Sequence, residues 1–351
     1  MDISQIVLEG DTPGVAFTLP VFRFKGTDPN APSVYIQAAL HAGELPGTAL
    51  CHYLTGLLKV ADDKGDLRGD ITLIPHANPI GLAQSHFGEL QGRFDLGTRT
   101  NFNRDFPLVS LSERAEHLAD APELGTVARL KRKLLSMALE ADLMLDLHCD
   151  DESLQYAYMD PVFWPEAADL ASALAMDAVF LSDGESTAFE EAVGYAMKRA
   201  APGAAKLPGK LAVTLELRGL ADVDGDLAKR DAAGLFAFLK GRGVIAGGTG
   251  TPSPFIGPVS PLDCVEMIRS PEAGTVLFHR APGDRVKAGD LLATVLSRPG
   301  FPEGDVIITA PQDGLIVTRV SRRYVRRGGD LMKIACNTLS ARKRAPGTLE
   351  D

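Results

Sequence analysis

Apolar residues between positions 33 and 241 fall into short runs rich in β-branched side chains and longer segments with helical periodicity. The short runs predict buried strands at residues 33–40, 70–75, 141–148 and 210–217. The longer segments predict helices at residues 46–60, 123–140, 166–177, 188–200 and 227–240. Strands that alternate with helices favour an α/β fold, in which helices flank a mostly parallel sheet. Ligands bind such sheets beyond the carboxyl ends of the strands.

The pattern changes after residue 241. Residues 241–261 are rich in Gly, Pro and Ser and show no periodicity, which is typical of a linker. Beyond them, two stretches around Ser270 and Gly289 are echoed 40 residues later around Ala310 and Gly329. Short β-rich runs separated by turn residues predict a small all-β unit with two internal repeats. We therefore divide the chain into residues 1–245, a β-rich appendage at 246–340, and a frayed tail at 341–351.

Composition narrows the classes of function. The formal net charge of −10 argues against duplex nucleic acid as a partner, because binding it requires a basic surface. No apolar run approaches the ~18 residues needed to span a membrane, and the first residues lack the pattern of a signal peptide. The four cysteines are scattered, without a CxxC pair. This favours a reducing cytoplasm over a disulfide framework or a cysteine zinc site.

Metal-binding residue types collect where two predicted strands end. His41 and Glu44 follow the first strand, and His148 ends the strand at 141–148. Two histidines and one carboxylate leave a coordination position open, as catalytic zinc sites do. The sequence therefore predicts one zinc ion per chain at these three residues, and the alternative at this stage is a chance arrangement of short His and Glu patterns. Asp146, two residues before His148, lies on the same side of the strand and is placed to orient an imidazole.

Glu216 lies among apolar residues at the end of the strand at 210–217. Partial burial would raise the pKa of its carboxyl group and suit it to act as a general base. The alternative at this stage is a structural ion pair with Arg218. These two interpretations carry equal weight on the sequence alone.

A loop interrupted by glycines carries Arg93, Arg99, Asn103 and Arg104. Guanidinium groups bind carboxylates in pairs of hydrogen bonds, so this cluster predicts recognition of an anionic group. In a chain of net negative charge, a local basic cluster near a predicted metal site favours a role in substrate binding over a solvated loop.

The order of these motifs resembles that of succinylglutamate desuccinylase/aspartoacylase proteins, over about residues 33–240. The motifs are His41-Ala-Gly-Glu44, Asn78-Pro79, Asn103-Arg104-Asp-Phe-Pro107, Asp146-Leu-His148 and Glu216. The resemblance implies the zinc-carboxypeptidase fold and a deacylase activity. It implies that His41, Glu44 and His148 bind zinc, that Glu216 activates water, and that Asn103 and Arg104 hold a substrate carboxylate. An upstream arginine that polarises the scissile carbonyl is assigned to Arg93.

The chain departs from the family pattern at two places. It has Asn101-Phe-Asn103-Arg104 where aspartoacylases have Asp-Leu-Asn-Arg, and Arg99 has no counterpart in the motif. The C-terminal part resembles the β-appendage of longer bacterial members and a barrel-sandwich domain of the biotinyl or lipoyl type. A carrier domain needs a lysine at its central hairpin, and none occurs between Lys287 and Lys333. A swinging-arm role is therefore not expected, while a lid, a docking surface and an oligomer contact stay open.

We therefore expect a cytoplasmic, zinc-dependent hydrolase that cleaves the amide bond of a small N-acylated amino acid or related compound. Two alternatives stay open: a metallocarboxypeptidase acting on peptides, and a non-enzymatic binding or scaffold protein. The sequence leaves open the acyl group, the amine and assembly into a homo-oligomer.

Overall fold

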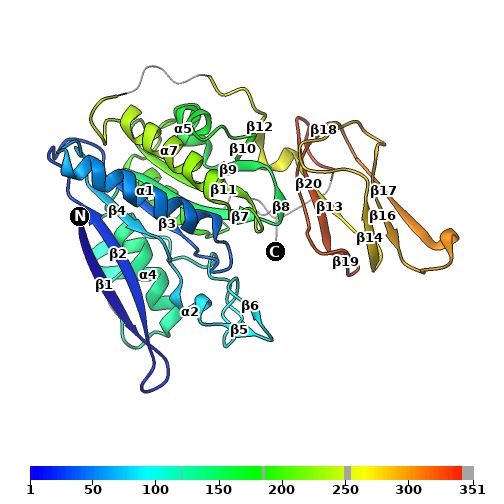
Figure 1. The fold of residues 1–351 in the computed structure, drawn as a ribbon, viewed down its shortest axis with the longest axis horizontal. Coiled ribbons are helices and arrows are strands. Elements are labelled where there is room, and N and C mark those ends of the chain that lie inside the picture. The colour runs from blue at the N-terminus through cyan, green and yellow to red at the C-terminus, as the bar shows by residue number, and fades with distance from the viewer. Residues whose placement is uncertain (120, 184–185, 249–253, 342–351) are drawn as a thin grey trace.

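The protein is described by a computed structural model that covers the chain except residues 120, 184–185, 249–253 and 342–351. The predicted tail thus lies, apart from Ala341, outside the described residues. A nine-stranded sheet forms the larger part of the molecule (Figure 1). Its strands, in order across the sheet, are β1 (Asp2–Glu9), β2 (Ala16–Phe24), β4 (Ile71–Ile74), β3 (Val34–Ala38), β7 (Leu143–Asp150), β11 (Leu211–Gly219), β9 (Gln155–Met159), β10 (Ala178–Leu181) and β12 (Val259–Pro261).

The centre of this sheet is parallel. Strands β4, β3, β7 and β11 run in the same direction and correspond to the four predicted strands. The sequences of these strands are nearly continuous apolar runs, because helices cover both faces of the sheet there. The edges differ from the expectation: β1 and β2 form an antiparallel hairpin, and β9 is antiparallel to β11. The fold is therefore mixed α/β, with a large sheet that is parallel only in part.

The helices lie on both faces of the sheet. Helices α1 (Pro46–Asp63), α5 (Ala168–Ala173) and α7 (Gly225–Gly241) pack together on one face, and α4 (Thr126–Ala138) and α6 (Phe189–Ala200) pack on the other. Short helices α2 (Pro79–Leu82) and α3 (Arg114–His117) lie in connecting segments. Helix α1 begins with Pro46, whose missing N–H is harmless in the first turn. None of the helices in the described ranges has the length and apolar character needed to cross a membrane.

Two smaller antiparallel sheets make up the C-terminal β unit, residues 262–340 (Figure 1). One sheet consists of β13 (Val265–Arg269), β20 (Asp330–Cys336), β18 (Gly314–Arg319) and β15 (Arg285–Val286). The other consists of β17 (Asp305–Thr309), β16 (Leu291–Leu296), β14 (Gly274–Phe278) and β19 (Tyr324–Val325). Strands β13 and β15 pair with β20 and β18, and strands β17 and β19 pair with β16 and β14, so each sequence repeat places two strands in the sheet of the other.

The β unit is joined to the α/β part through a short strand that follows β7. This strand, β8 (Glu152–Ser153), pairs with β18 of the β unit. Another hairpin, β5 (Ser85–His86) with β6 (Glu89–Leu90), projects from the α/β part ahead of the arginine-containing loop.

Candidate active site

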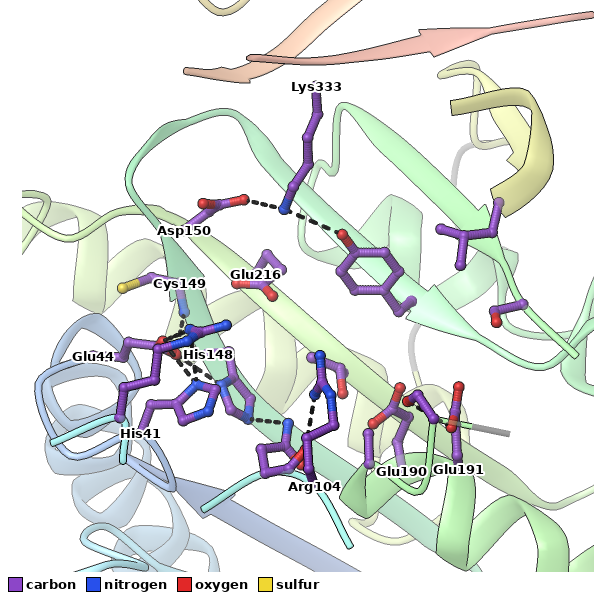
Figure 2. Close-up of a pocket in the computed structure, with 18 residues that line it drawn as sticks. His41, Glu44, Arg104, His148, Cys149, Asp150, Glu190, Glu191, Glu216 and Lys333 are labelled. Carbon is purple, nitrogen blue, oxygen red and sulfur yellow. Dashed lines mark hydrogen bonds and ion pairs between the residues drawn. The ribbon is translucent and has the colours of Figure 1, made fainter. Parts of the chain in front are cut away.

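A cavity that is open to solvent lies at the carboxyl ends of the three central strands β3, β7 and β11. All seven side chains predicted for the site line it: His41, Glu44, Arg93, Asn103, Arg104, His148 and Glu216. The parallel order of β3, β7 and β11 explains this meeting, because it brings their carboxyl ends to the same edge of the sheet. Figure 2 shows how the side chains surround the cavity.

His41, Glu44 and His148 form a compact, buried cluster. The Nδ1 atom of His41 lies 2.9 Å from Glu44 Oε1, and the Nδ1 atom of His148 lies 2.7 Å from Glu44 Oε2. One possible ligand atom from each residue lies within 4.8 Å of the others. Each side chain is at most 8% exposed. A single metal ion could therefore be held by these three residues.

The two imidazole rings are fixed through their Nε2 atoms. His41 Nε2 lies 2.9 Å from Asn101 Oδ1, and His148 Nε2 lies 2.9 Å from Asp146 Oδ2. Both oxygens can accept a hydrogen bond from Nε2, so with a metal ion bound at Nδ1 they would hold each ring in the tautomer that leaves Nδ1 free to bind it. The predicted position of Asp146 agrees with this contact. Asn101 was not predicted as a partner, although it is the residue at which the chain departs from the family motif.

Glu216 lies beside this cluster on β11, in register with His148 on β7. Its Oε2 atom is buried and has no hydrogen-bond partner within the described part of the chain. Burial, followed by the negative charge of Glu44, raises the pKa of Glu216 to about 8. The alternative ion pair with Arg218 does not form, because a bulge after Glu216 and a φ of 64° at Arg218 turn that side chain away. Arg218 instead binds Asp231 and Gln155.

The three arginines of the loop lie in different environments. Arg93 Nη1 is 3.3 Å from both Glu44 Oε1 and His41 Nδ1. Arg104 lines the cavity and donates to the carbonyl oxygen of Asn103 at 2.8 Å. Asn103 is buried, and its Oδ1 accepts from the Phe189 N–H at the start of α6. Arg99 is exposed and does not line the cavity.

Several residues of the cavity wall were not predicted. Tyr158 lines the cavity, whereas its neighbour on β9, Tyr156, is fully buried. Glu190 and Glu191 enter from the first turn of α6, across the cavity from the histidines in Figure 2. Lys333 enters from the β unit and binds Asp150. Neither Glu190 nor Lys333 belongs to a short motif, so no local sequence signal marks them.

Several proteins with solved structures resemble this chain in sequence and in fold. A succinylglutamate desuccinylase/aspartoacylase family protein from Shewanella amazonensis SB2B is 28% identical, with a TM-score of 0.83 over 95% of this chain and 98% of that chain. A second, from Shewanella frigidimarina NCIMB 400, is 26% identical, with a TM-score of 0.82 over 96% and 97% of the two chains. A search of curated protein sequences finds no match.

The ectoine utilization protein EutE (DoeB) of Ruegeria pomeroyi, in its product-bound structure, shares the fold at 20% identity. Its TM-score is 0.71, over 96% of this chain and 95% of that one. The family model for the succinylglutamate desuccinylase/aspartoacylase catalytic domain matches residues 30–242, which is more than half of the chain and contains the whole His-Glu-His cluster. By this match the protein belongs to the succinylglutamate desuccinylase/aspartoacylase family.

Proposed function

We propose that this protein is a zinc-dependent deacylase that hydrolyses the amide bond of a small N-acylated amino acid or related compound. The observation that carries the proposal is the presence, in one cavity, of the buried His-Glu-His cluster and of Glu216. Family membership supports an enzyme that acts on amide bonds. The four free, buried cysteines among the described residues support a cytoplasmic location.

The donor set fits one zinc ion per chain. Two imidazole Nδ1 atoms and a carboxylate are ligands that zinc prefers, and three protein ligands leave a position for water or substrate. When bound, zinc supplies Lewis acidity toward a carbonyl oxygen and lowers the pKa of a water molecule. The contacts of Asn101 and Asp146 hold the two rings in the orientation that this ligand set needs.

Glu216, beside the histidine cluster, is placed to move a proton. As a carboxylate it accepts the proton of the attacking water at Oε2 and passes it to the leaving amine. A positive charge at the histidine cluster would lower the pKa of Glu216 from its value near 8, which favours the ionised form that this step needs. Arg93, next to the cluster, is placed to stabilise the oxyanion, and Arg104 to hold a substrate carboxylate.

The wall that the β unit adds to the cavity favours a small substrate. Leu262 and Lys333 of the β unit contribute to its wall, so the cavity is bounded on that side. This supports an N-acyl amino acid over a long peptide, the substrate of the alternative metallocarboxypeptidase. A screen of acetyl-, succinyl- and longer-acyl amino acids against dipeptides distinguishes the two.

Two substitutions test the proposal. In Glu216→Gln we expect zinc to stay bound while turnover falls by about 10²–10⁴-fold, the usual contribution of a positioned general base. In His148→Ala we expect the loss of both zinc and activity. Metal analysis and steady-state kinetics measure these outcomes. Full zinc occupancy in His148→Ala, or normal turnover in Glu216→Gln, would contradict the assignment.

A further inference from the structure

The β unit has a fixed position beside the cavity. Strand β8 of the α/β part pairs with β18 of the β unit, and Glu152 on β8 binds both Arg319 and Arg323 at 2.5 and 2.6 Å. An apolar cluster crosses the same boundary and includes Phe180 from the α/β part and Val317 from the β unit. Backbone pairing and apolar packing therefore fix the position of a β20 side chain that points toward the cavity, and the partly exposed ion pairs of Glu152 add little to this.

Lys333 on β20 is such a side chain. Its Nζ atom donates to Asp150 Oδ2 at 2.6 Å, to Tyr156 Oη at 3.2 Å and to Tyr158 Oη at 3.4 Å. The side chain is only 5% exposed, yet it lines the cavity together with Glu216. Figure 2 shows Lys333 reaching down from the β unit to Asp150, above Glu216.

The charges of the cavity explain why a lysine at this position matters. Asp150, Glu190, Glu191 and Glu216 all contribute carboxyl groups to the wall. Asp150 lies two residues after His148, so its charge is close to the place where substrate must bind. A buried carboxylate without a counter-ion is costly, and it repels any carboxylate that enters the same cavity.

From these contacts we propose that Lys333 is a specificity-determining residue that the C-terminal β unit supplies to the active site. By neutralising Asp150 and holding the Tyr158 hydroxyl in the wall, Lys333 allows the cavity to accept a substrate that carries a carboxylate. The inference rests on the proposed deacylase function, and it assigns the β unit a direct part in substrate selection.

The test compares an N-acetyl amino acid with its carboxamide, which lacks the negative charge. In Lys333→Met we expect kcat/KM for the carboxylate substrate to fall by about 10-fold or more, mainly through KM, because the charge of Asp150 is no longer balanced. The carboxamide should lose no more than about 3-fold. The double variant Lys333→Met/Asp150→Asn removes both charges, and the discrimination against the carboxylate should disappear.

Glu152→Gln is the matched control, because it weakens another ion pair between the same two parts of the chain, and Glu152 does not line the cavity. We expect its kinetics to match those of the wild type on both compounds. Equal losses on both compounds in Lys333→Met, or the same loss in Glu152→Gln, would overturn the specificity role. If Lys333→Met does not fold, Asp150→Asn, which leaves the charge of Lys333 unbalanced, still tests it: kcat/KM for the carboxylate relative to the carboxamide should rise above the wild-type ratio, and an unchanged ratio would contradict the proposal.

Calorimetric binding of the same two compounds to the metal-stripped protein separates this inference from the proposed function. If the wild type hydrolyses neither compound but binds the carboxylate about 10-fold or more tightly than Lys333→Met does, the deacylase function fails and the role of Lys333 stands. If binding of the carboxylate does not depend on Lys333, the inference fails whatever the activity of the wild type.

Discussion

The three arginines of one short loop differ in what their guanidinium groups can reach. Arg93 contacts two of the three residues that could hold a metal ion, and its side chain is 41% exposed. Arg104 lines the cavity beside Asn103, and Arg99 extends into solvent. The same residue type can therefore serve three purposes here, and substitution can distinguish them.

We expect Arg93→Ala to lower kcat by roughly 10²–10³-fold on every substrate, because a group that meets the oxyanion acts as charge develops. Arg104→Ala should mainly raise KM, and only for substrates with a carboxylate, because it binds ground and transition state alike. Steady-state kinetics on a substrate pair with and without a carboxylate measures both. Arg99→Ala is the control within the same loop, and a turnover defect in that variant would contradict this division of roles.

Glu190 gives the stability of the protein a dependence on pH. Burial, and then the negative charge of Glu191, raises the pKa of Glu190 from 4.5 to about 7. Between about pH 4.5 and 7 the folded protein therefore holds a proton that the unfolded chain has lost. This contribution to stability is fully present below pH 4.5 and is lost as the pH rises through 7.

Glu190→Gln removes that titration. We therefore expect the wild type to lose stability relative to Glu190→Gln when the pH rises from 5 to 8, measured by urea unfolding of the metal-stripped proteins. The exposed Glu89→Gln serves as the control, and its difference from the wild type should stay constant. A difference between wild type and Glu190→Gln that does not change with pH would contradict the assignment.

The sequence could predict the residues that strand ends bring together, but not those that arrive from irregular or distant segments. His41, Glu44, His148 and Glu216 were predictable because they lie near or just after the carboxyl ends of buried strands, and these ends must meet. Asn101 was not, because it reaches His41 across 60 residues from a loop without periodicity. The roles of all these residues in catalysis stay predictions.

At the scale of elements, the position of His148 depends on how closely α1 packs against β7. Gly47 lies in the first turn of α1, and a Cβ atom there would come within 2.7 Å of the Cβ of Leu147, the residue before His148. No larger residue fits this contact unless the helix or the strand moves.

Gly47→Ala should therefore destabilise the protein by about 1–3 kcal/mol, the usual cost of overpacking, and should weaken metal binding. Gly56→Ala is the matched control in the same helix: a Cβ there meets nothing within 4 Å. It should raise stability by about 0.5–1 kcal/mol, because alanine favours the helix. Urea unfolding measures both changes in stability. Equal effects of the two substitutions would show that the close contact between Gly47 and Leu147 does not determine how closely α1 packs against β7.

Elements that are buried on both faces were predicted to within a few residues, and elements at the edges were not. The predicted helix at 227–240 is α7 (Gly225–Gly241), which Asp224 caps through the backbone amides of Asp226 and Leu227. No strand was assigned before residue 33, yet β1 and β2 form an edge hairpin there, with alternating exposure in β1. Strand β9 is short and antiparallel, so the alternation of strands and helices gave no sign of it.

At the scale of the whole molecule, the relation between the α/β part and the β unit could not be predicted. The ion pair of Lys333 with Asp150 joins residues 183 positions apart, and no local pattern specifies such a contact. The sequence between Lys287 and Lys333 contains no lysine, which argued against a carrier domain. The same observation gave no indication that Lys333 itself reaches the active site. The boundary at residues 245 and 246 stays a prediction.

The exchange of edge strands between the two sheets of the β unit bears on how the unit could arise from a single repeat. Both edge strands of each sheet come from the other repeat. A chain that contained a single repeat would have to take those strands from a second molecule. The β unit thus has the architecture of a strand-swapped dimer whose two halves have been fused into one polypeptide.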